Sequence, residues 1–205
     1  MSDVSHGTGF REHILIASRF LRNPRTIGAV SASSRAMARI MVDTIPTDRP
    51  VAVVELGPGT GSFTGAIVAR VAKGSRIFAI DVEQAFINQV RRRWPSVECV
   101  CASAVDLEQL VAERGLEPVD HIVSGLPFAS LRVEETRRIL DGIERTLRPG
   151  GTFTTFMYVH AYGLSSGRYF RQEMSRRIGT AADRRLVLKN FPAAFILTWR
   201  RPPVG

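Results

Sequence analysis

The feature that most constrains the fold is a glycine-rich segment directly after a short apolar run. The run Val53-Val54-Glu55-Leu56 leads into Gly57-Pro58-Gly59-Thr60-Gly61, and an amphipathic stretch begins at Phe63. Glycine lets the backbone bend sharply and lets a ligand approach without a Cβ in the way. A buried strand, a glycine turn and a helix in this order are typical of the first unit of a doubly wound α/β fold.

The glycine spacing and a following acid indicate which ligand the segment binds. The spacing is Gly-x-Gly-x-Gly, not the Gly-x-Gly-x-x-Gly of dinucleotide-binding proteins. Asp81 directly follows the next apolar run, Arg76–Ile80, and a carboxylate there accepts hydrogen bonds from both hydroxyls of a ribose. Taken singly, the glycines make a tight turn and Asp81 caps a helix. Together they predict a site for S-adenosylmethionine (SAM), which carries a ribose but no phosphate.

Short apolar runs alternate with amphipathic stretches along the rest of the chain, which is typical of an α/β fold. The expected strands are Val51–Leu56, Arg76–Ile80, Val97–Val100, His121–Ser124, Thr152–Tyr158, Arg185–Lys189 and Ala194–Trp199. The expected helices are Phe63–Val71, Gln84–Arg93, Leu107–Arg114, Val133–Thr146 and Gly167–Ile178. A short link joins the last two strands, which favours an antiparallel hairpin. We therefore predict a Rossmann-like α/β fold with a seven-stranded, mostly parallel sheet, a C-terminal antiparallel hairpin and helices on both faces.

The first 45 residues precede the first strand. They form a predicted helical extension that binds the membrane or acts as a lid, residues 1–45, ahead of a catalytic domain, residues 46–205. One amphipathic helix has an apolar face and arginines mostly opposite it; the apolar face is Phe10, Ile14, Ala17 and Leu21. A second helix is predicted to begin at Ser33 or Ser34. Its apolar face is Met37, Ile40, Met41 and Ile45.

The chain carries 28 Lys and Arg against 19 Asp and Glu, a net charge of +9. Such an excess favours an anionic partner, either nucleic acid or an acidic membrane surface, although a merely basic enzyme is the simpler alternative. We expect no signal peptide, because the apolar run Ile14–Ala17 is short and flanked by charges. Cys99 and Cys101 are expected to be reduced and structural, and because two thiols without a neighbouring His make no zinc site, we expect no metal site.

Two further loops follow the third and fourth strands. Ser103 and Ala104 stand where many methyltransferases carry an acid that binds the adenine amino group, so a hydroxyl replaces that acid here. The fourth strand ends in Ser124-Gly125-Leu126-Pro127-Phe128, at the strand ends where the methyl group should lie. The predicted cofactor contacts are Glu55, Gly57, Pro58, Gly59, Gly61, Asp81, Val82, Ser103, Ala104, Ser124, Gly125 and Leu126.

These motifs resemble the soluble bacterial phospholipid N-methyltransferases, which convert phosphatidylethanolamine stepwise to phosphatidylcholine. The resemblance covers nearly the whole chain, and its more specific segments are Ile27–Ser34 and Gly125–Phe128. Ala32, where proline is expected, and Ser103 depart from the pattern. The resemblance implies a class I methyltransferase that uses SAM, releases S-adenosylhomocysteine, and acts on an amino-phospholipid at an anionic membrane surface. It also implies a cytoplasmic protein, peripherally bound to the inner face of the membrane; a monomer is expected.

The reaction requires an unprotonated amine, and so a base or a water path. The candidates lie after the fifth strand and are Tyr158, His160 and Tyr162. His160 is the candidate base, and Tyr158 is expected to orient the headgroup. Phe128 is expected to offer its ring to a cationic nitrogen, although a place in the core is the plain alternative. For the lipid phosphate, Arg22, Arg168 and Arg171 remain open choices.

Two other functions remain open. An RNA or DNA adenine N6-methyltransferase, such as an rRNA dimethylase, suits the basic charge and the loop at Ser124–Phe128. However, Ser124 stands where Asn or Asp normally contacts the base, and we expect no RNA-binding domain after the last strand, so we regard nucleic acid as the less favoured partner. A non-catalytic membrane or RNA binder is the third alternative, against which the intact glycines and Asp81 argue.

Overall fold

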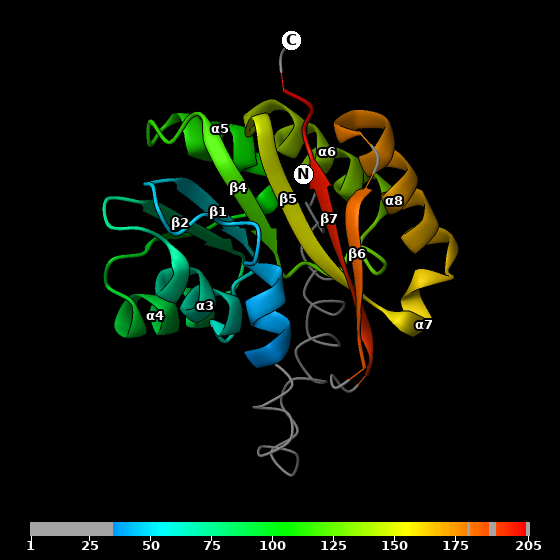
Figure 1. The fold of residues 1–205 in the computed structure, drawn as a ribbon, viewed down its shortest axis with the longest axis horizontal. Helices are drawn as coiled ribbons and strands as arrows, with labels where there is room; N and C mark the ends of the chain where they lie inside the picture. The colour runs from blue at the N-terminus through cyan, green and yellow to red at the C-terminus, as the bar shows by residue number, and fades with distance from the viewer. Residues whose placement is uncertain (1–34, 180, 189–191, 204–205) are drawn as a thin grey trace, which may run out of the picture.

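A computed structural model describes residues 35–179, 181–188 and 192–203 (Figure 1). The predicted N-terminal amphipathic helix, the segment Ile27–Ser34, the candidate cation Arg22 and Lys189 lie outside the described residues. The first described helix covers residues 35–41. Within the described ranges, no helix is both long and apolar enough to cross a membrane.

The strands form one seven-stranded sheet in the order β3-β2-β1-β4-β5-β7-β6. Their bounds are β1 Ala52–Leu56, β2 Arg76–Asp81, β3 Glu98–Cys101, β4 Val119–Ser124, β5 Leu147–Tyr158, β6 Ala181–Val187 and β7 Ala194–Arg200. Strands β3, β2, β1, β4 and β5 pair in parallel, whereas β7 is antiparallel to both β5 and β6. The predicted fold class, including the antiparallel C-terminal hairpin, is confirmed.

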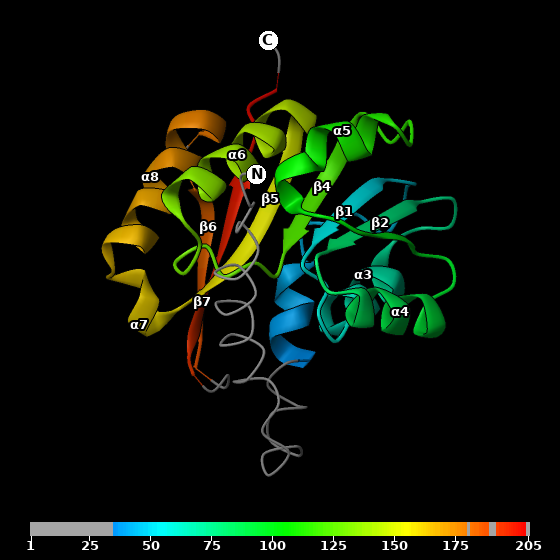
Figure 2. The same ribbon diagram turned by 180° about the vertical axis from the view of Figure 1, so that it is seen from behind.

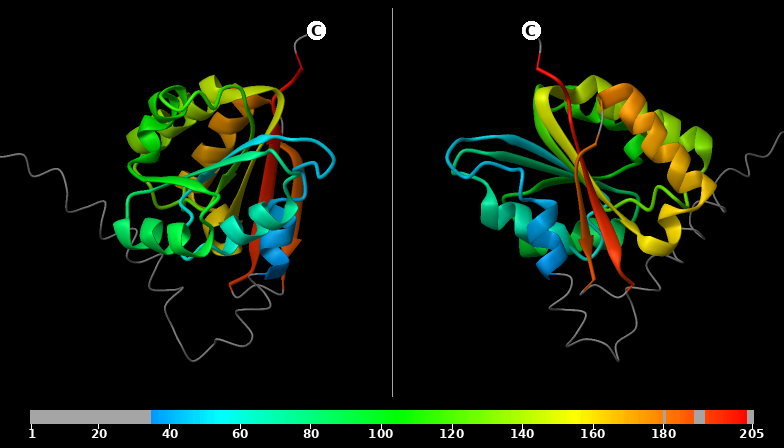
Figure 3. Two further views of the ribbon diagram at one scale, coloured as in Figure 1. Left: turned by 90° about the vertical axis from the view of Figure 1, so that its left-hand side faces the viewer. Right: turned by 45° about the vertical axis from the view of Figure 1, so that its right-hand side comes forward.

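Helices cover both faces of the sheet, as the two views of Figure 3 show. Their bounds are α3 Ser62–Arg70, α4 Gln84–Arg93, α5 Leu107–Ala112, α6 Val133–Thr146, α7 Val159–Tyr162 and α8 Ser165–Ile178, with a 3₁₀ turn, η2, at Ala104–Asp106. One core cluster joins the sheet to α5, α6 and α8, the layer seen from behind in Figure 2. The other joins it to α3, α4 and the helix at residues 35–41.

Alternation along the strands builds these two cores. Val54 belongs to the α6 and α8 side, whereas its neighbour Val53 belongs to the α3 and α4 side. Met37, Met41 and Ile45 are buried in the second core, as the predicted apolar face of that helix requires. The N-terminal extension therefore begins to pack on the catalytic domain before the first strand.

Strand β6 and helix α7 are among the elements that differ from the sequence predictions. The sixth strand was predicted at Arg185–Lys189, but β6 begins at Ala181, where the register against β7 shifts. Small and charged residues gave no apolar signal there, because an edge strand needs only backbone pairing with β7. The short helix α7 follows β5 directly and was not predicted, since its four residues are too few for a helical period.

Candidate active site

The strand order reverses between β1 and β4, and ligands of open α/β sheets bind at the carboxyl ends of the strands beside such a reversal. The backbone N–H of Gly57 donates to the carbonyl of Ile80, at 2.8 Å, and that of Gly125 donates to the carbonyl of Leu56, at 2.7 Å. The loops after β1 and β4 are thus tied to each other and to β2. This places the predicted cofactor segment and the predicted acceptor segment side by side.

The glycines of the loops after β1 and β4 are required for two reasons: a backbone conformation with positive φ, and the close contact between the two loops. Gly57, Gly59 and Gly61 all have positive φ, at 71°, 52° and 84°, which disfavours any residue with a Cβ. A Cβ on Gly125 would lie 2.4 Å from the carbonyl oxygen of Gly57, so the two loops touch only because Gly125 lacks one. A Cβ on Gly59 would meet no described atom within 4 Å, which leaves open space over the loop.

Glu55 lies under this loop with its side chain fully buried. Its Oε2 accepts a hydrogen bond from the Thr64 hydroxyl at 2.7 Å, whereas its Oε1 has no partner in the described chain. Burial raises the pKa of Glu55 to about 8, against the opposing effect of the Thr64 hydrogen bond. A buried acceptor without a partner in the described chain, two residues before the glycine loop, fits a cationic ligand such as SAM, in which the amino group and the sulfonium are positively charged.

Asp81 ends β2 next to the loop and is 8% exposed. Its Oδ2 accepts from the backbone N–H of Gly59, at 3.1 Å, and its Oδ1 accepts from that of Glu83, at 2.9 Å. Burial raises the pKa of Asp81, while these two hydrogen bonds act in the opposite direction. Asp81 therefore organises the loop in addition to its predicted contact with the ribose, which stays a prediction.

The next strand ends beside Asp81, because Cys101 is its partner in the β2–β3 pairing. The Cys101 thiol donates to the carbonyl of Val82 at 3.4 Å, and both cysteines are free, as predicted. The Ser103 hydroxyl accepts from the backbone N–H of Val105 at 3.3 Å and so caps η2. The predicted adenine contacts of Ser103 and Ala104 thus lie on the turn after β3, and they remain predictions.

The loop after β4 is held from inside. The Ser124 hydroxyl is fully buried and accepts from the backbone N–H of Leu126 at 3.2 Å. Phe128 is 2% exposed and stacks on Phe170, with ring centroids 4.2 Å apart. This placement favours the core alternative for Phe128 over the expected contact with an amine. Leu126 packs beneath Gly57, where a Cβ would lie 2.9 Å from its Cδ2.

Tyr158 and His160 lie where β5 ends and α7 begins. Their rings stack with centroids 5.7 Å apart, and the Tyr158 ring also meets Phe156 edge-on at 5.3 Å. Burial raises the pKa of the half-buried Tyr158, so its hydroxyl stays protonated at neutral pH, whereas His160 is exposed. This pair is brought together as predicted, and its catalytic role stays a prediction.

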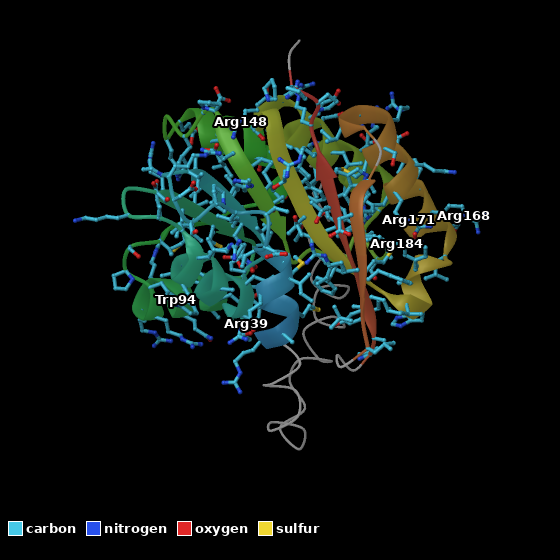
Figure 4. All side chains as sticks on the ribbon, in the orientation of Figure 1. Arg39, Trp94, Arg148, Arg168, Arg171 and Arg184 are labelled. Carbon is cyan, nitrogen blue, oxygen red and sulfur yellow. The ribbon has the colours of Figure 1, made fainter. Side chains whose placement is uncertain are left out.

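Sequence reasoning missed Trp94, which directly follows α4. A Cβ on Gly61 would lie 2.3 Å from the Trp94 ring, and one on Gly65 would lie 2.9 Å from it. Trp94, labelled in Figure 4, therefore packs against the start of α3, directly after the cofactor loop. The recurrence of glycine four residues after Gly61 was the signal that a large side chain packs there.

Comparisons with known proteins agree with this geometry. A family model described as a methyltransferase domain matches residues 53–151. An ornithine lipid N-methyltransferase of Singulisphaera acidiphila is 32% identical over 70% of this chain and 76% of its own length. A ribosomal RNA small subunit methyltransferase A of Burkholderia mallei is 31% identical, but over only 43% of this chain and 33% of its own.

Solved structures share the fold. An N1-methyltransferase of Burkholderia thailandensis, in complex with 1,6-didemethyltoxoflavin and S-adenosylhomocysteine, has a TM-score of 0.67 at 19% identity, over 98% of this chain and 93% of its own. The N-methyltransferase NodS of Bradyrhizobium japonicum has a TM-score of 0.66 at 16% identity, over 86% and 99%. SAM is accordingly the methyl donor, and S-adenosylhomocysteine is the product. The chain belongs to the class I SAM-dependent methyltransferases.

Proposed function

We propose that the chain transfers methyl groups from SAM to the amine of phosphatidylethanolamine and its methylated intermediates, towards phosphatidylcholine. The observation that carries this is the extended similarity to a lipid N-methyltransferase, over 76% of that protein. An amine on a lipid is the acceptor class this supports. The choice of phosphatidylethanolamine rests on the resemblance of Ile27–Ser34 and Gly125–Phe128 to that family. An ornithine lipid is the competing acceptor of the same class.

The loop after β4 argues against a nucleic acid base. The Ser124 hydroxyl is buried and occupied by the N–H of Leu126. Because the side chain is fully buried, its oxygen is not exposed to an adenine amino group. A small aliphatic amine makes no such demand, since it needs only close access to the loop where Gly125 touches Gly57.

Bound SAM supplies an electrophilic methyl group, and the remaining task of the protein is to position a neutral amine against it. Positioning provides much of the acceleration in such a transfer. An ammonium headgroup has to lose a proton first. His160 is exposed and stacked on Tyr158 at the end of β5, which suits it to pass that proton to water while Tyr158 orients the headgroup.

An exposed apolar edge supports the use of a membrane-bound substrate. The exposed large apolar side chains of the described chain include Val159, Leu164, Leu186 and Leu188, at 44%, 51%, 48% and 73%. They lie at the carboxyl end of the sheet, because Tyr158 of β5 and Val187 of β6 both pair with Ala194 of β7. Figure 1 shows α7 and the end of β6 at this edge. We call these four residues the apolar edge and propose that it faces the bilayer.

A competition experiment tests the acceptor. Full-length protein is incubated with labelled SAM and two competing acceptors at a time. The acceptors are liposomes that contain phosphatidylethanolamine, liposomes that contain an ornithine lipid, and ribosomal RNA. Label in phosphatidylethanolamine is the expected result. Label in the ornithine lipid would show that this lipid is the acceptor. Label in RNA supports an RNA methyltransferase, and no label in any acceptor supports a non-catalytic membrane or RNA binder.

A further inference from the structure

Two arginines converge on one tyrosine beside the proposed acceptor site. The guanidinium carbon of Arg171, on α8, lies 3.6 Å from the ring centroid of Tyr162, on α7. That of Arg184, on β6, lies 5.8 Å from the same centroid, and its Nη1 donates to the Tyr162 hydroxyl at 3.1 Å. Figure 4 shows Arg168, Arg171 and Arg184 on the same side of the molecule.

Arg171 is fixed in place without the help of a carboxylate. Its Nη1 donates to the carbonyls of Tyr162 and Gly167, at 2.7 and 3.0 Å, and contacts the sulfur of Met157 at 3.6 Å. All of these bonds use Nη1, so Nε and Nη2 donate to no residue of the described chain. A guanidinium held this way still presents a fork of donors that matches an oxyanion.

The arginine cluster, which consists of Arg168, Arg171 and Arg184, differs from the other end of α8 in that its arginines have no carboxylate partners among the described residues. Arg177, near the end of the helix, contacts the carboxylates of Asp141, Glu144 and Glu173. Arg168, Arg171 and Arg184, by contrast, have no carboxylate within 4.0 Å in the part of the chain that the structure describes. Burial lowers the pKa of Arg171, and repulsion from Arg168 and Arg184 lowers it further. Like charges gathered without a counterion favour the binding of an anion from outside.

The cluster is next to the proposed catalytic pair, Tyr158 and His160, along the chain. Met157, which touches Arg171, precedes Tyr158 on β5, and Tyr162 ends the short helix that follows Tyr158 and His160. Leu164, on the apolar edge, follows Tyr162 closely and lies 51% exposed. An amphiphile that lies along this path places its charged headgroup by the arginines and its apolar chains on the exposed edge.

We infer that Arg171 and Arg184, together with the Tyr162 hydroxyl, bind the oxyanion of the amino-lipid headgroup and so select lipids that carry an anion near their amine. This rests on the proposed function in taking the acceptor to be an amino lipid. A phosphodiester and a carboxylate offer the same chemistry to a guanidinium fork. The site therefore distinguishes both from an amine without an anion.

Binding of water-soluble probes to full-length protein loaded with S-adenosylhomocysteine tests the inference by calorimetry. The probes are dihexanoyl phosphatidylethanolamine, which supplies a phosphate, Nα-hexanoyl ornithine, which supplies a carboxylate, and octylamine, which supplies neither. The variants are R171Q, R184Q and R171K. The control is R92Q, because Arg92 is an exposed arginine on the opposite helical layer.

Wild-type protein and R92Q are expected to bind at least one oxyanion probe about tenfold or more tightly than octylamine, and the tighter of the two probes identifies the oxyanion. R171Q and R184Q should lose that preference while octylamine binding stays unchanged, and R171K should recover part of it. The inference would be overturned if the wild type bound octylamine as tightly as both oxyanion probes. It would also be overturned if R171Q and R184Q kept the preference for an oxyanion probe over octylamine. If the wild type prefers an oxyanion probe and the variants lose that preference, but the wild type methylates no lipid, the anion site is supported and the proposed function is wrong.

Discussion

The buried carboxyl of Glu55 should make both folding stability and SAM binding depend on pH. Without ligand its pKa is raised from 4.5 to about 8 by burial, so it is mostly neutral at pH 7. Its contribution to folding stability is complete below pH 4.5 and is lost as the pH rises through about 8. A cationic ligand favours the ionised form, so binding of SAM at pH 7 should release close to one proton.

Calorimetry of SAM binding in two buffers of different ionisation enthalpy measures that proton. The wild-type affinity should rise as the pH increases towards 8, by up to about tenfold per pH unit. In E55Q, which keeps the shape but cannot ionise, both the proton release and the pH dependence should disappear. Equal proton release by E55Q would show that another group is responsible.

His121 predicts a loss of stability in acid. Its Nδ1 lies 2.7 Å from the hydroxyl of Thr152, which in turn lies 3.1 Å from that of Thr44, while its Nε2 is buried without a described partner. Burial lowers the pKa of His121 from 6.5 to about 4. The unfolded chain therefore binds this proton more readily, so the contribution is complete above pH 6.5 and declines as the pH falls towards 4.

The decline should reach about 1.4 kcal/mol per pH unit at most within that window. Urea unfolding of the wild type and H121Q at pH 7.5 and 5.0 measures it. The wild type should lose more stability between the two pH values than H121Q does. An identical loss in both proteins would assign the acid sensitivity to other groups.

The sequence predicted the positions of some site residues but not of others. Glu55 and Asp81 were placed correctly beside the glycine loop, because their positions follow from strand ends. The side chain of Phe128 could not be placed, since its direction depends on Phe170, on α8 far along the chain. Arg184 was not singled out for the headgroup, because nothing in sequence brings β6 against Tyr162.

At the scale of elements, the parallel strands and long helices were predictable because burial on both faces gives unbroken apolar runs. Helices α4 and α6 have the predicted bounds. Strand β5 extends back to Leu147, through a register irregularity against β4 where Gly150 takes a positive φ. Backbone pairing of this kind leaves no apolar period, so sequence could not show it.

The contact between α3 and the residue after α4 gives a testable prediction. Gly61 has a φ of 84°, and a Cβ there would lie 2.3 Å from Trp94. G61A should destabilise the protein by about 2–4 kcal/mol and weaken SAM binding, through both strain and overpacking. Thermal unfolding and SAM titration measure the two effects.

Two variants separate strain from overpacking. Gly115 also has a positive φ, but a Cβ there meets no described atom within 4 Å, so G115A should cost only about 1 kcal/mol. W94L in the G61A background should restore part of the loss. Equal costs for G61A and G115A, with no rescue by W94L, would show that Trp94 does not buttress the loop.

On the scale of the whole molecule, the loops after β1 and β4, helix α7 and the end of β6 lie on the side of the sheet where the strands β1, β4, β5 and β6 end (Figure 1). Parallel strands produce this, because their carboxyl ends meet at one side of the sheet. Combined with a net charge of +9, the arrangement predicts salt-sensitive binding to anionic vesicles.

Vesicle flotation at two salt concentrations tests this orientation. L164D and L188D should each weaken binding about tenfold, because a buried leucine contributes about 1.5–3 kcal/mol. A112D is the matched control, since Ala112 is exposed at the end of α5, towards the amino ends of the strands and so away from the apolar edge. An equal loss in A112D, or vesicle binding that does not change with salt, would contradict this orientation.

The most direct measurement is mass spectrometry of lipids after incubation of full-length protein with SAM and phosphatidylethanolamine liposomes. The proposed function predicts mono-, di- or trimethylated phosphatidylethanolamine. Yield should fall at least about tenfold in G125A, whose Cβ would lie 2.4 Å from the Gly57 carbonyl oxygen, and stay unchanged in A112D, at the exposed end of α5. Unmodified phosphatidylethanolamine, together with methyl groups on another acceptor in the same mixture, would contradict it.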